Sequence, residues 1–182
     1  MDSLIRSARS ADAEQIACVL AECFHPASGL GSLLQPWILA SLHNELERRL
    51  ARQPAYHSCL IALIDDTVVG TVEVAVRPLP EPWWLPSFIH RDRLVYVSNL
   101  AVRPSWRRRG IARDLLAESE RTAQHWHQAD IRLHVMADNA GALQLYRSLG
   151  YTIENSEREF PLIGARKHLL CKNLPAVVCG DA

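Results

Sequence analysis

The sequence has no net charge, no long apolar run and no paired cysteine spacing, and each absence excludes a class of protein. Twenty basic residues balance twenty acidic residues over 182 positions, which argues against a general binder of nucleic acid or of membrane surfaces. No apolar run approaches the ~18 residues of a membrane span, and the N-terminal residues do not resemble a signal peptide. We therefore expect a soluble, unprocessed protein of the cytoplasm.

The cysteines and histidines lack the spacings of structural or metal sites. The cysteines are odd in number and scattered, with no CxxC pair, at Cys18, Cys23, Cys59, Cys171 and Cys179. Neither a disulfide framework nor a zinc site is indicated, and a reducing compartment is the simplest home. The histidines have no ligand spacing either, so we expect chemistry without a metal ion.

The composition fits one folded domain. Hydrophobic residues make up 48% of the chain, enough to fill one substantial core at this length. We expect a single domain over residues 1–174 and a flexible tail over residues 175–182. The sequence leaves open whether the protein is a monomer or a homodimer.

Hydrophobic periodicity predicts an alternation of strands and helices. Strands are expected at residues 4–6, 58–64, 67–76, 94–102, 131–135, 152–153 and 167–171. Helices are expected over a segment carrying Ile16 to Phe24 on one side, and over residues 33–52, 111–128 and 139–149. The order is β-α-α-β-β-β-α-β-α-β-β, with a hairpin at residues 65–66, a bulge suggested by Gly70, and a proline-rich aromatic loop at residues 77–92.

The most informative stretch is residues 98–116, which predicts a strand, a basic glycine turn and a helix in immediate succession. Pro104 ends the strand, Gly110 and Ala112 allow a ligand to approach the backbone, and the helix begins near Ile111. The first-turn N–H groups of a helix lack intrahelical partners and lie at the positive end of its dipole. Five arginines between Arg103 and Arg113 add positive charge, so this turn suits a small polyanion such as a diphosphate.

The order Arg107-x-x-Gly110-x-Ala112 resembles the acetyl-coenzyme-A loop of the GNAT superfamily, the Gcn5-related N-acetyltransferases. A second signature of that family is matched at Asn139, Ala142, Leu145, Tyr146, Gly150 and Tyr151. Residues 96–102 and 133–139 are most similar to the cyanobacterial and plastid protein acetyltransferases. The resemblance implies an α/β GNAT fold: a central mixed, mostly antiparallel sheet with a splayed central strand pair, flanked by helices on both faces.

The resemblance also implies how acetyl-coenzyme A (acetyl-CoA), the co-substrate, is bound. Main-chain groups of the central strand would hold the pantetheine arm, at Leu100, Ala101 and Val102. The basic turn would hold the pyrophosphate, through Arg107, Arg108, Arg109, Gly110, Ile111, Ala112 and Arg113. Asn139 would contact the pantetheine region, although an ordinary helix cap is an equally good interpretation. Which arginine reaches the 3′-phosphate is left open.

Three side chains are candidates for proton transfer. Tyr146 matches the general acid of the family and would also touch the cofactor; the alternative is a packed aromatic residue on a helix. Glu73, between valines on a strand, is the first candidate for a general base, because desolvation would raise its pKa. His134 is the second, acting through water. A solvent-facing glutamate and a hydrogen-bonded core histidine are the alternatives.

The function implied is an acetyl-CoA-dependent N-acetyltransferase that acts on a primary amine. Subgroup resemblance favours protein lysine side chains or N-terminal α-amines of a protein or peptide partner. Acetylation of a small arylalkylamine or polyamine is one alternative, and a non-catalytic acetyl-CoA-binding module is another.

Overall fold

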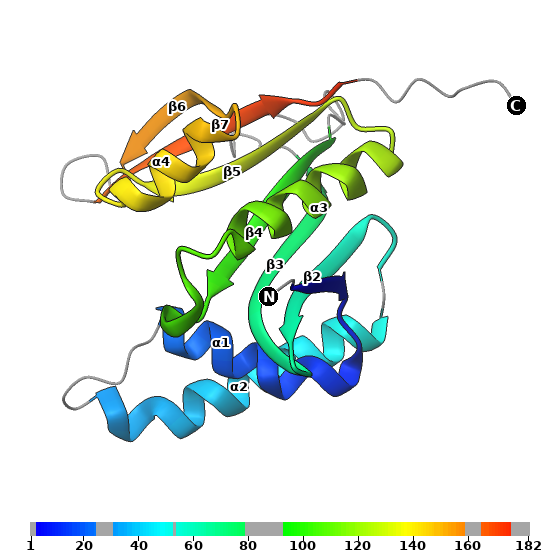
Figure 1. The fold of residues 1–182 in the computed structure, drawn as a ribbon, viewed down its shortest axis with the longest axis vertical. Helices are drawn as coiled ribbons and strands as arrows, with labels where there is room; N and C mark the ends of the chain where they lie inside the picture. Colours follow the sequence, from blue (N-terminus) through cyan, green and yellow to red (C-terminus); the bar gives the residue numbers. More distant parts are fainter. Residues whose placement is uncertain (1–2, 25–30, 53, 79–92, 159–164, 176–182) are drawn as a thin grey trace, which may run out of the picture. The chain divides into compact units, whose positions relative to one another are not determined.

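The computed structural model describes residues 3–24, 31–52, 54–78, 93–158 and 165–175, and its elements follow the predicted order (Figure 1). The strands are β1 (Leu4–Ser7), β2 (His57–Ile64), β3 (Thr67–Pro78), β4 (Arg93–Val102), β5 (Asp130–Met136), β6 (Thr152–Arg158) and β7 (Arg166–Asn173). The helices are α1 (Ala13–Phe24), α2 (Gly31–Arg52), α3 (Ile111–His125) and α4 (Ala140–Ser148). The α/β fold class is confirmed. The aromatic loop at residues 79–92 and the tail at residues 176–182 lie outside the described residues.

The strands form one hydrogen-bonded sheet in the order β1-β2-β3-β4-β5-β7-β6. The pairs β1–β2, β5–β7 and β6–β7 are antiparallel, whereas β4 and β5 are parallel. The parallel register covers only Val95 to Val97 against Ile131 to Leu133. The predicted mixed, mostly antiparallel sheet is therefore confirmed, and its parallel pair is held over a short length.

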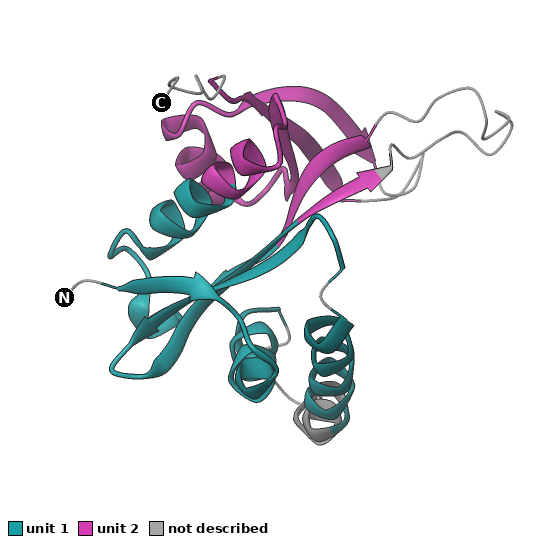
Figure 2. Cartoon of the chain, turned by 90° about the vertical axis from the view of Figure 1, so that its right-hand side faces the viewer, with its two compact units in different colours: residues 1–74, 99–119 teal, residues 75–98, 120–182 magenta. Residues whose placement is uncertain are grey.

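The chain divides into two compact units (Figure 2). Unit 1 comprises residues 1–74 and 99–119, and unit 2 comprises residues 75–98 and 120–182. The boundaries fall within β3 and β4, so both strands contribute to both units. The expected single domain over residues 1–174 stays a prediction.

Unit 1 has its core between α1, α2 and the strands. Small and branched side chains of these elements are buried together, including Ile16, Leu46, Ile61 and Val68. Phe24 differs from the expectation, because its side chain is 53% exposed at the end of α1. The predicted hairpin joins β2 to β3 through Asp65 and Asp66, whose positive φ angles of 47° and 59° are those of a type I′ turn.

Gly70 lies where α3 approaches the sheet of unit 1. A Cβ atom at this position would lie 3.1 Å from both the Ala101 carbonyl oxygen and the Leu115 side chain. The bulge that we predicted from this glycine stays a prediction, and the structure shows a close approach of helix and strand here. The absent side chain lets the start of α3 lie directly against β3 and β4.

Replacing Gly70 by alanine is therefore expected to destabilise the protein by about 2 kcal/mol, because the added methyl group overpacks this contact. Urea unfolding measures the change. Gly141→Ala is the matched control, since a Cβ atom there meets nothing closer than 4.0 Å and alanine favours the helix. Equal effects of the two substitutions would contradict the packing argument.

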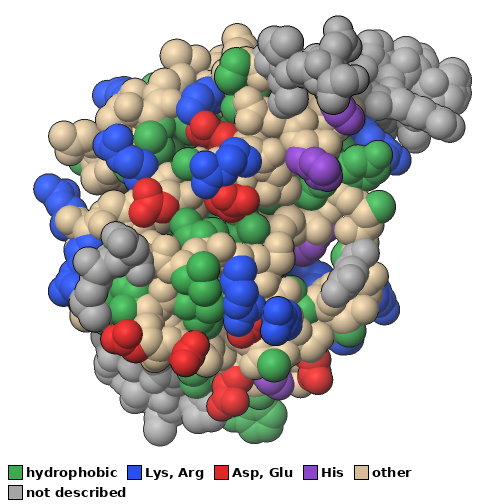
Figure 3. Space-filling view, turned by 45° about the vertical axis from the view of Figure 1, so that its right-hand side comes forward, with side chains coloured by type: hydrophobic (Ala, Val, Ile, Leu, Met, Phe, Trp, Pro, Cys, Tyr) green, Lys and Arg blue, Asp and Glu red, His purple; other side chains and the backbone are tan. Residues whose placement is uncertain are grey.

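Two features of the described residues bear on contact with membranes: the length and apolarity of the helices, and the sign of the surface charge. No described helix is long and apolar enough to cross a bilayer. On the face drawn in Figure 3, basic and acidic side chains are interspersed rather than gathered by sign.

Candidate functional site

In unit 1, the strand β4 leads into the candidate anion site, and its regular conformation changes at Asn99, near its end. Asn99 has a φ angle of +54°, a left-handed conformation that non-glycine residues adopt at some cost. The alternation of buried and exposed side chains in β4 breaks at this point. The regular strand is therefore interrupted immediately before Leu100, the residue whose main chain the GNAT resemblance assigns to the acyl-donor site.

Of the three residues that follow Asn99, Leu100 is half-buried, not part of the core as expected, and the other two are buried. Ala101 and Val102 are 4% and 9% exposed. The Val102 carbonyl oxygen accepts hydrogen bonds from Arg107 Nε at 3.0 Å and from Cys23 Sγ at 3.3 Å. Both lone pairs of this oxygen thus accept hydrogen bonds, and the bond from Arg107 connects the end of β4 to the basic turn.

The basic turn exposes a run of main-chain donors at the start of α3. Arg108 and Gly110 have positive φ angles of 63° and 87°, and the first helical bond runs from the Asp114 N–H to the Gly110 carbonyl at 3.1 Å. Within the described part of the chain, no hydrogen bond uses the N–H groups of residues 108–113. Such a run of free donors at a helix N-terminus favours an anion.

The arginines of this turn divide into two groups. Arg103 donates to the Val68 carbonyl and pairs with Glu22 at 3.1 Å, and Arg107 is held by Val102. The Arg109 guanidinium lies 4.6 Å from the centre of the Trp106 ring. Arg108 and Arg113 are exposed and have no polar partner among the residues described. These two side chains are therefore available to a bound polyanion.

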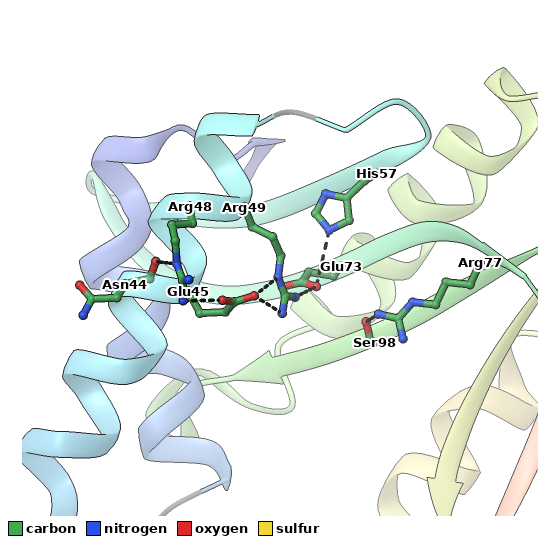
Figure 4. A network of polar contacts seen from close by, with 8 residues as sticks. All are labelled: Asn44, Glu45, Arg48, Arg49, His57, Glu73, Arg77 and Ser98. Atoms are coloured by element: carbon green, nitrogen blue, oxygen red, sulfur yellow. Dashed lines mark hydrogen bonds and ion pairs between the residues drawn. The ribbon is translucent and has the colours of Figure 1, made fainter.

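Glu73 lies on β3 within a polar cluster of unit 1 (Figure 4). Its side chain is buried, at 2% exposure, which excludes the solvent-facing alternative. Arg49 of α2 donates to a Glu73 carboxylate oxygen at 3.0 Å, and His57 Nε2 lies 3.7 Å from the same oxygen.

We predicted that the pKa of Glu73 is raised, and this direction is wrong. Burial alone would raise this pKa, as we predicted, but His57, the positive charge of Arg49 and the nearby Asn99 side chain together lower it below the ordinary glutamate value. The sequence pattern identified the burial but not the partners. Glu73 is an ionised, firmly held carboxylate rather than a base tuned to neutral pH.

In unit 2, His134 is paired with a residue that the sequence analysis did not single out as a candidate. The Tyr96 hydroxyl and His134 Nδ1 are 2.6 Å apart, across the parallel strands β4 and β5. Burial, followed by the charge of Lys167, lowers the pKa of His134. The Tyr96 hydroxyl and Nδ1 can make this hydrogen bond in either direction, depending on the tautomer, and Nε2 is buried without a partner among the described residues.

Tyr146 lies on α4 and is 7% exposed, packed edge-on against Tyr151 at a centroid distance of 5.8 Å. Burial and, to a smaller degree, Tyr96 raise the pKa of Tyr146 to about 12. The hydroxyl therefore keeps its proton at neutral pH and can donate it in a hydrogen bond. Both of our interpretations, the packed aromatic residue and the proton donor, are compatible with this position.

Asn139 caps α4, as one of the two interpretations required. Its side-chain oxygen accepts a hydrogen bond from the Ala142 N–H at 3.1 Å. The side-chain amide group makes no hydrogen bond within the described residues and can still donate to a ligand. For metal ions, the described residues contain no cluster of three or more suitable side chains.

Comparison with known proteins places this geometry in context. A model of the acetyltransferase (GNAT) family matches residues 19–151. The chain is 30% identical over 117 residues to L-amino acid N-acetyltransferase AaaT of Escherichia coli (strain K12). The aligned region covers 64% of this chain and 65% of that protein. It is 43% identical over 93 residues to GCN5-related N-acetyltransferase 4, chloroplastic, of Arabidopsis thaliana, covering 50% of this chain and 31% of that protein.

The fold is also found among solved structures. Arabidopsis thaliana NAA60 in complex with acetyl-CoA superimposes with a TM-score of 0.69 at 19% identity, over 94% of this chain and 98% of that chain. At this identity the likeness concerns the fold alone. The chain spans about a third to two thirds of the length of the two curated relatives.

Proposed function

The chain belongs to the acetyltransferase (GNAT) family, and from this premise we propose that it transfers acetyl from acetyl-CoA to lysine side chains or N-terminal α-amines of proteins. The observation that carries the proposal is the run of free N–H groups where β4 leads into α3. In the reaction, a neutral amine attacks the thioester carbonyl, the C–N bond forms, and the C–S bond breaks. The amine gives up a proton and the thiolate gains one.

The described residues fit acetyl-CoA as the donor substrate. The N–H groups of residues 108–113 would bind the pyrophosphate, and the exposed Arg108 and Arg113 supply positive charge beside it. The main chain at Leu100 would hold the acyl end and donate to the carbonyl oxygen as it gains negative charge. Asn139 retains a free amide group for the pantetheine arm.

The proton donors and acceptors follow from the pKa directions in unit 2. Tyr146, protonated at neutral pH, would donate a hydrogen bond to the sulfur as the thiolate leaves. His134, whose pKa is lowered, stays neutral at pH 7. In the tautomer whose Nδ1–H donates to the Tyr96 oxygen, Nε2 keeps the lone pair that would accept the amine proton through water. Tyr96 would orient the imidazole through the hydrogen bond to Nδ1. Glu73 is not assigned this role, because its carboxylate is already held by its partners.

The proposal is tested by incubating the protein with acetyl-CoA and peptides that carry either a free N-terminus or an internal lysine. Mass spectrometry then maps the acetyl groups. Acetylated peptides would support the proposed substrate class, and the modified position would identify the preferred amine. Unmodified peptides together with bound acetyl-CoA would refute it and leave a small-molecule acceptor or a non-catalytic binding module.

A small acceptor is the second candidate. It is supported by the similarity over 117 residues to a relative named for acetylation of L-amino acids. The α-amine of a free amino acid lies beside its own ionised carboxylate, so it holds its proton more firmly than a peptide N-terminus, whose reference pKa is about 8, and its acetylation would also need a base. A panel of free amino acids, arylalkylamines and polyamines in the same assay separates this candidate from protein acetylation.

Replacing His134 by glutamine is expected to lower kcat/KM about tenfold for a lysine peptide and less for an N-terminal α-amine. The difference arises because a lysine amine, with a reference pKa of about 10.4, is almost wholly protonated at pH 7. The measurement uses two peptides, one with a blocked N-terminus and one lysine, and one with a free N-terminus and no lysine.

His168→Gln on β7 is the control, since the Nδ1 atom of His168 pairs with Ser156 rather than with Tyr96. It is expected to leave both rates unchanged. Equal losses with both peptides in His134→Gln would argue that His134 has no role in proton removal.

The compartment is part of the proposal. The described cysteines, Cys18, Cys23, Cys59 and Cys171, are unpaired, which supports a reducing environment such as the cytoplasm. Three further Arabidopsis relatives are named as chloroplastic, so imaging of a tagged chain in a photosynthetic cell tests cytoplasm against plastid.

A further inference from the structure

In unit 2, the strands β4 and β5 have one buried face and one polar face. Val95 and Leu133 are among the side chains of the buried face. Tyr96, Ser98 and His134 are half-buried and lie on the other face, because side chains alternate along a strand. We call the side that carries these three residues the polar face. It holds the Tyr96–His134 hydrogen bond, so an acceptor amine that reaches His134 meets this face.

Arg77, near the end of β3, lies over the polar face. Its guanidinium carbon is 5.2 Å from the centre of the Tyr96 ring, and Nη2 donates to the Ser98 hydroxyl oxygen at 3.4 Å (Figure 4). The side chain is exposed, and within the described part of the chain no carboxylate pairs with it. A guanidinium group has five N–H donors in a planar fork. Most of the donors of Arg77 are therefore available to a ligand.

Two other cations near His134 are opposed by acidic residues. Arg132 on β5 pairs with Glu154 at 2.7 Å. Lys167 on β7 lies directly opposite Glu157 in the register of β6 and β7. Arg77 differs from both, because its positive charge is not opposed by an acid among the described residues. An anionic group is therefore favoured beside Arg77, and a polyamine is disfavoured there.

We propose that Arg77 binds a carboxylate of the acceptor, close to the amine that gives its proton to His134. This inference rests on the proposed function, because it assigns His134 to the amine. The centre of the Tyr96 ring is 5.2 Å from the guanidinium carbon and 5.6 Å from the centre of the imidazole. One or two residues of an extended peptide can cover the distance between these two groups.

The carboxylate has two possible sources. It belongs either to an aspartate or glutamate next to the acetylated residue of a peptide, or to the acceptor itself when this is a free amino acid. In both cases the bond to Arg77 is charge-assisted, and the guanidinium fork can hold both carboxylate oxygens. Arg77 therefore selects among acceptors by charge, while His134 and Tyr146 act on the reacting atoms.

Three blocked peptides test the selection, each with one lysine whose neighbours are aspartate, asparagine or arginine. For the wild type, the KM of the aspartate peptide is expected to be about fivefold lower than that of the asparagine peptide, the upper range for an exposed ion pair. The kcat values should be similar, because the carboxylate does not touch the reacting atoms. In Arg77→Gln the two KM values are expected to become equal, and Arg77→Glu is expected to prefer the arginine peptide.

Arg166→Gln is the matched control. Arg166 is exposed, and it lies on the opposite face of β7 from its neighbour Lys167, which pairs with Met136 on the side of His134. This variant loses the same charge and is expected to keep the preference for aspartate. Higher salt should weaken that preference. Equal KM values for the three peptides in the wild type, or a preference for aspartate that persists in Arg77→Glu, would overturn the proposal.

L-leucine and L-leucinamide distinguish the two sources of the carboxylate. Their amines differ in basicity, so the ratio of their kcat/KM values is compared between the wild type and Arg77→Gln, where this difference cancels. A fall in the preference for leucine in the variant would identify the carboxylate of a free amino acid. An effect confined to the peptides would identify an acidic neighbour, and no effect on either set would overturn the proposal.

A binding measurement keeps this inference distinct from the proposed function. Calorimetry with coenzyme A present gives the Kd of the aspartate and asparagine peptides in their lysine-acetylated form, which cannot react further. The aspartate form is expected to bind the wild type about fivefold more tightly and to lose this advantage in Arg77→Gln. If this result is found and no amine is acetylated, the proposed function has failed while the carboxylate site has not. Acetylation without any dependence on neighbouring charge would overturn the carboxylate site alone.

Discussion

Replacing Tyr146 by phenylalanine is expected to lower kcat about hundredfold, the usual contribution of a positioned general acid. The substitution removes one hydroxyl group and keeps the packing of the ring, which is 7% exposed on α4. Burial raises the pKa of Tyr146 to about 12, so in the wild type the proton is present on the hydroxyl at every pH used for assay. Without it, the departing thiolate has no donor from α4.

The effect should appear in kcat rather than in binding. The Kd of acetyl-CoA, measured by calorimetry, is expected to change by about twofold or less, because the hydroxyl is needed as the thiolate forms. Rising pH should not reproduce the loss, since a group with a pKa near 12 stays protonated through pH 10.

Tyr151→Phe is the control for this prediction. Tyr151 packs against Tyr146 in an edge-on contact and is equally buried, at 2% exposure, but we assign its hydroxyl no chemical role. It is expected to keep wild-type kcat. A Tyr146→Phe enzyme with unchanged turnover would show that the tyrosine serves packing alone, and would restore the non-catalytic interpretation of the family motif at this position.

The order of elements and the anion site were predictable because both depend on local sequence. Runs of β-branched and apolar residues predicted β2 and β3, and Pro104 and Gly110 delimited the turn before α3. The free N–H groups follow from the start of any helix. The prediction therefore needed no knowledge of which elements lie side by side.

The polar partners were not predictable, since they come from distant segments. Arg49 reaches Glu73 from a helix 24 residues earlier, and nothing in the alternation of β3 signals it. The Tyr96–His134 contact depends on the register of two parallel strands, which periodicity does not determine. Asn99 gave only a weak signal, because asparagine tolerates positive φ more readily than most residues but does not require it.

These contacts change the roles that the sequence suggested. Burial without partners would have raised the pKa of Glu73 and favoured it as a base, whereas burial beside Arg49 keeps its carboxylate ionised and held in place. His134, rated second from the sequence, has the lowered pKa and the orienting partner that proton removal requires. The same reasoning applies to the arginines of the turn. Those whose guanidinium groups already bond to other residues of the protein are not free to bind phosphate.

Reversing the charge of both free arginines, as Arg108→Glu with Arg113→Glu, is expected to weaken acetyl-CoA binding about hundredfold. Each charge-assisted hydrogen bond contributes about 1.5–3 kcal/mol, and the introduced carboxylates repel the phosphates. Both side chains are exposed, so the free energy of unfolding should change little. Calorimetry at two salt concentrations measures Kd, and the variant should show a smaller salt dependence than the wild type.

Arg158→Glu with Arg166→Glu gives the same change in net charge on an exposed strand pair, β6 and β7. This control is expected to bind acetyl-CoA with a Kd close to that of the wild type, so a loss shared by both double variants would point to overall charge. Arg107→Ala should instead lower stability, because its guanidinium holds the Val102 carbonyl at the end of β4. If reversal at 108 and 113 left Kd unchanged, the main-chain donors alone would account for phosphate binding, and these two arginine side chains would have no part in it.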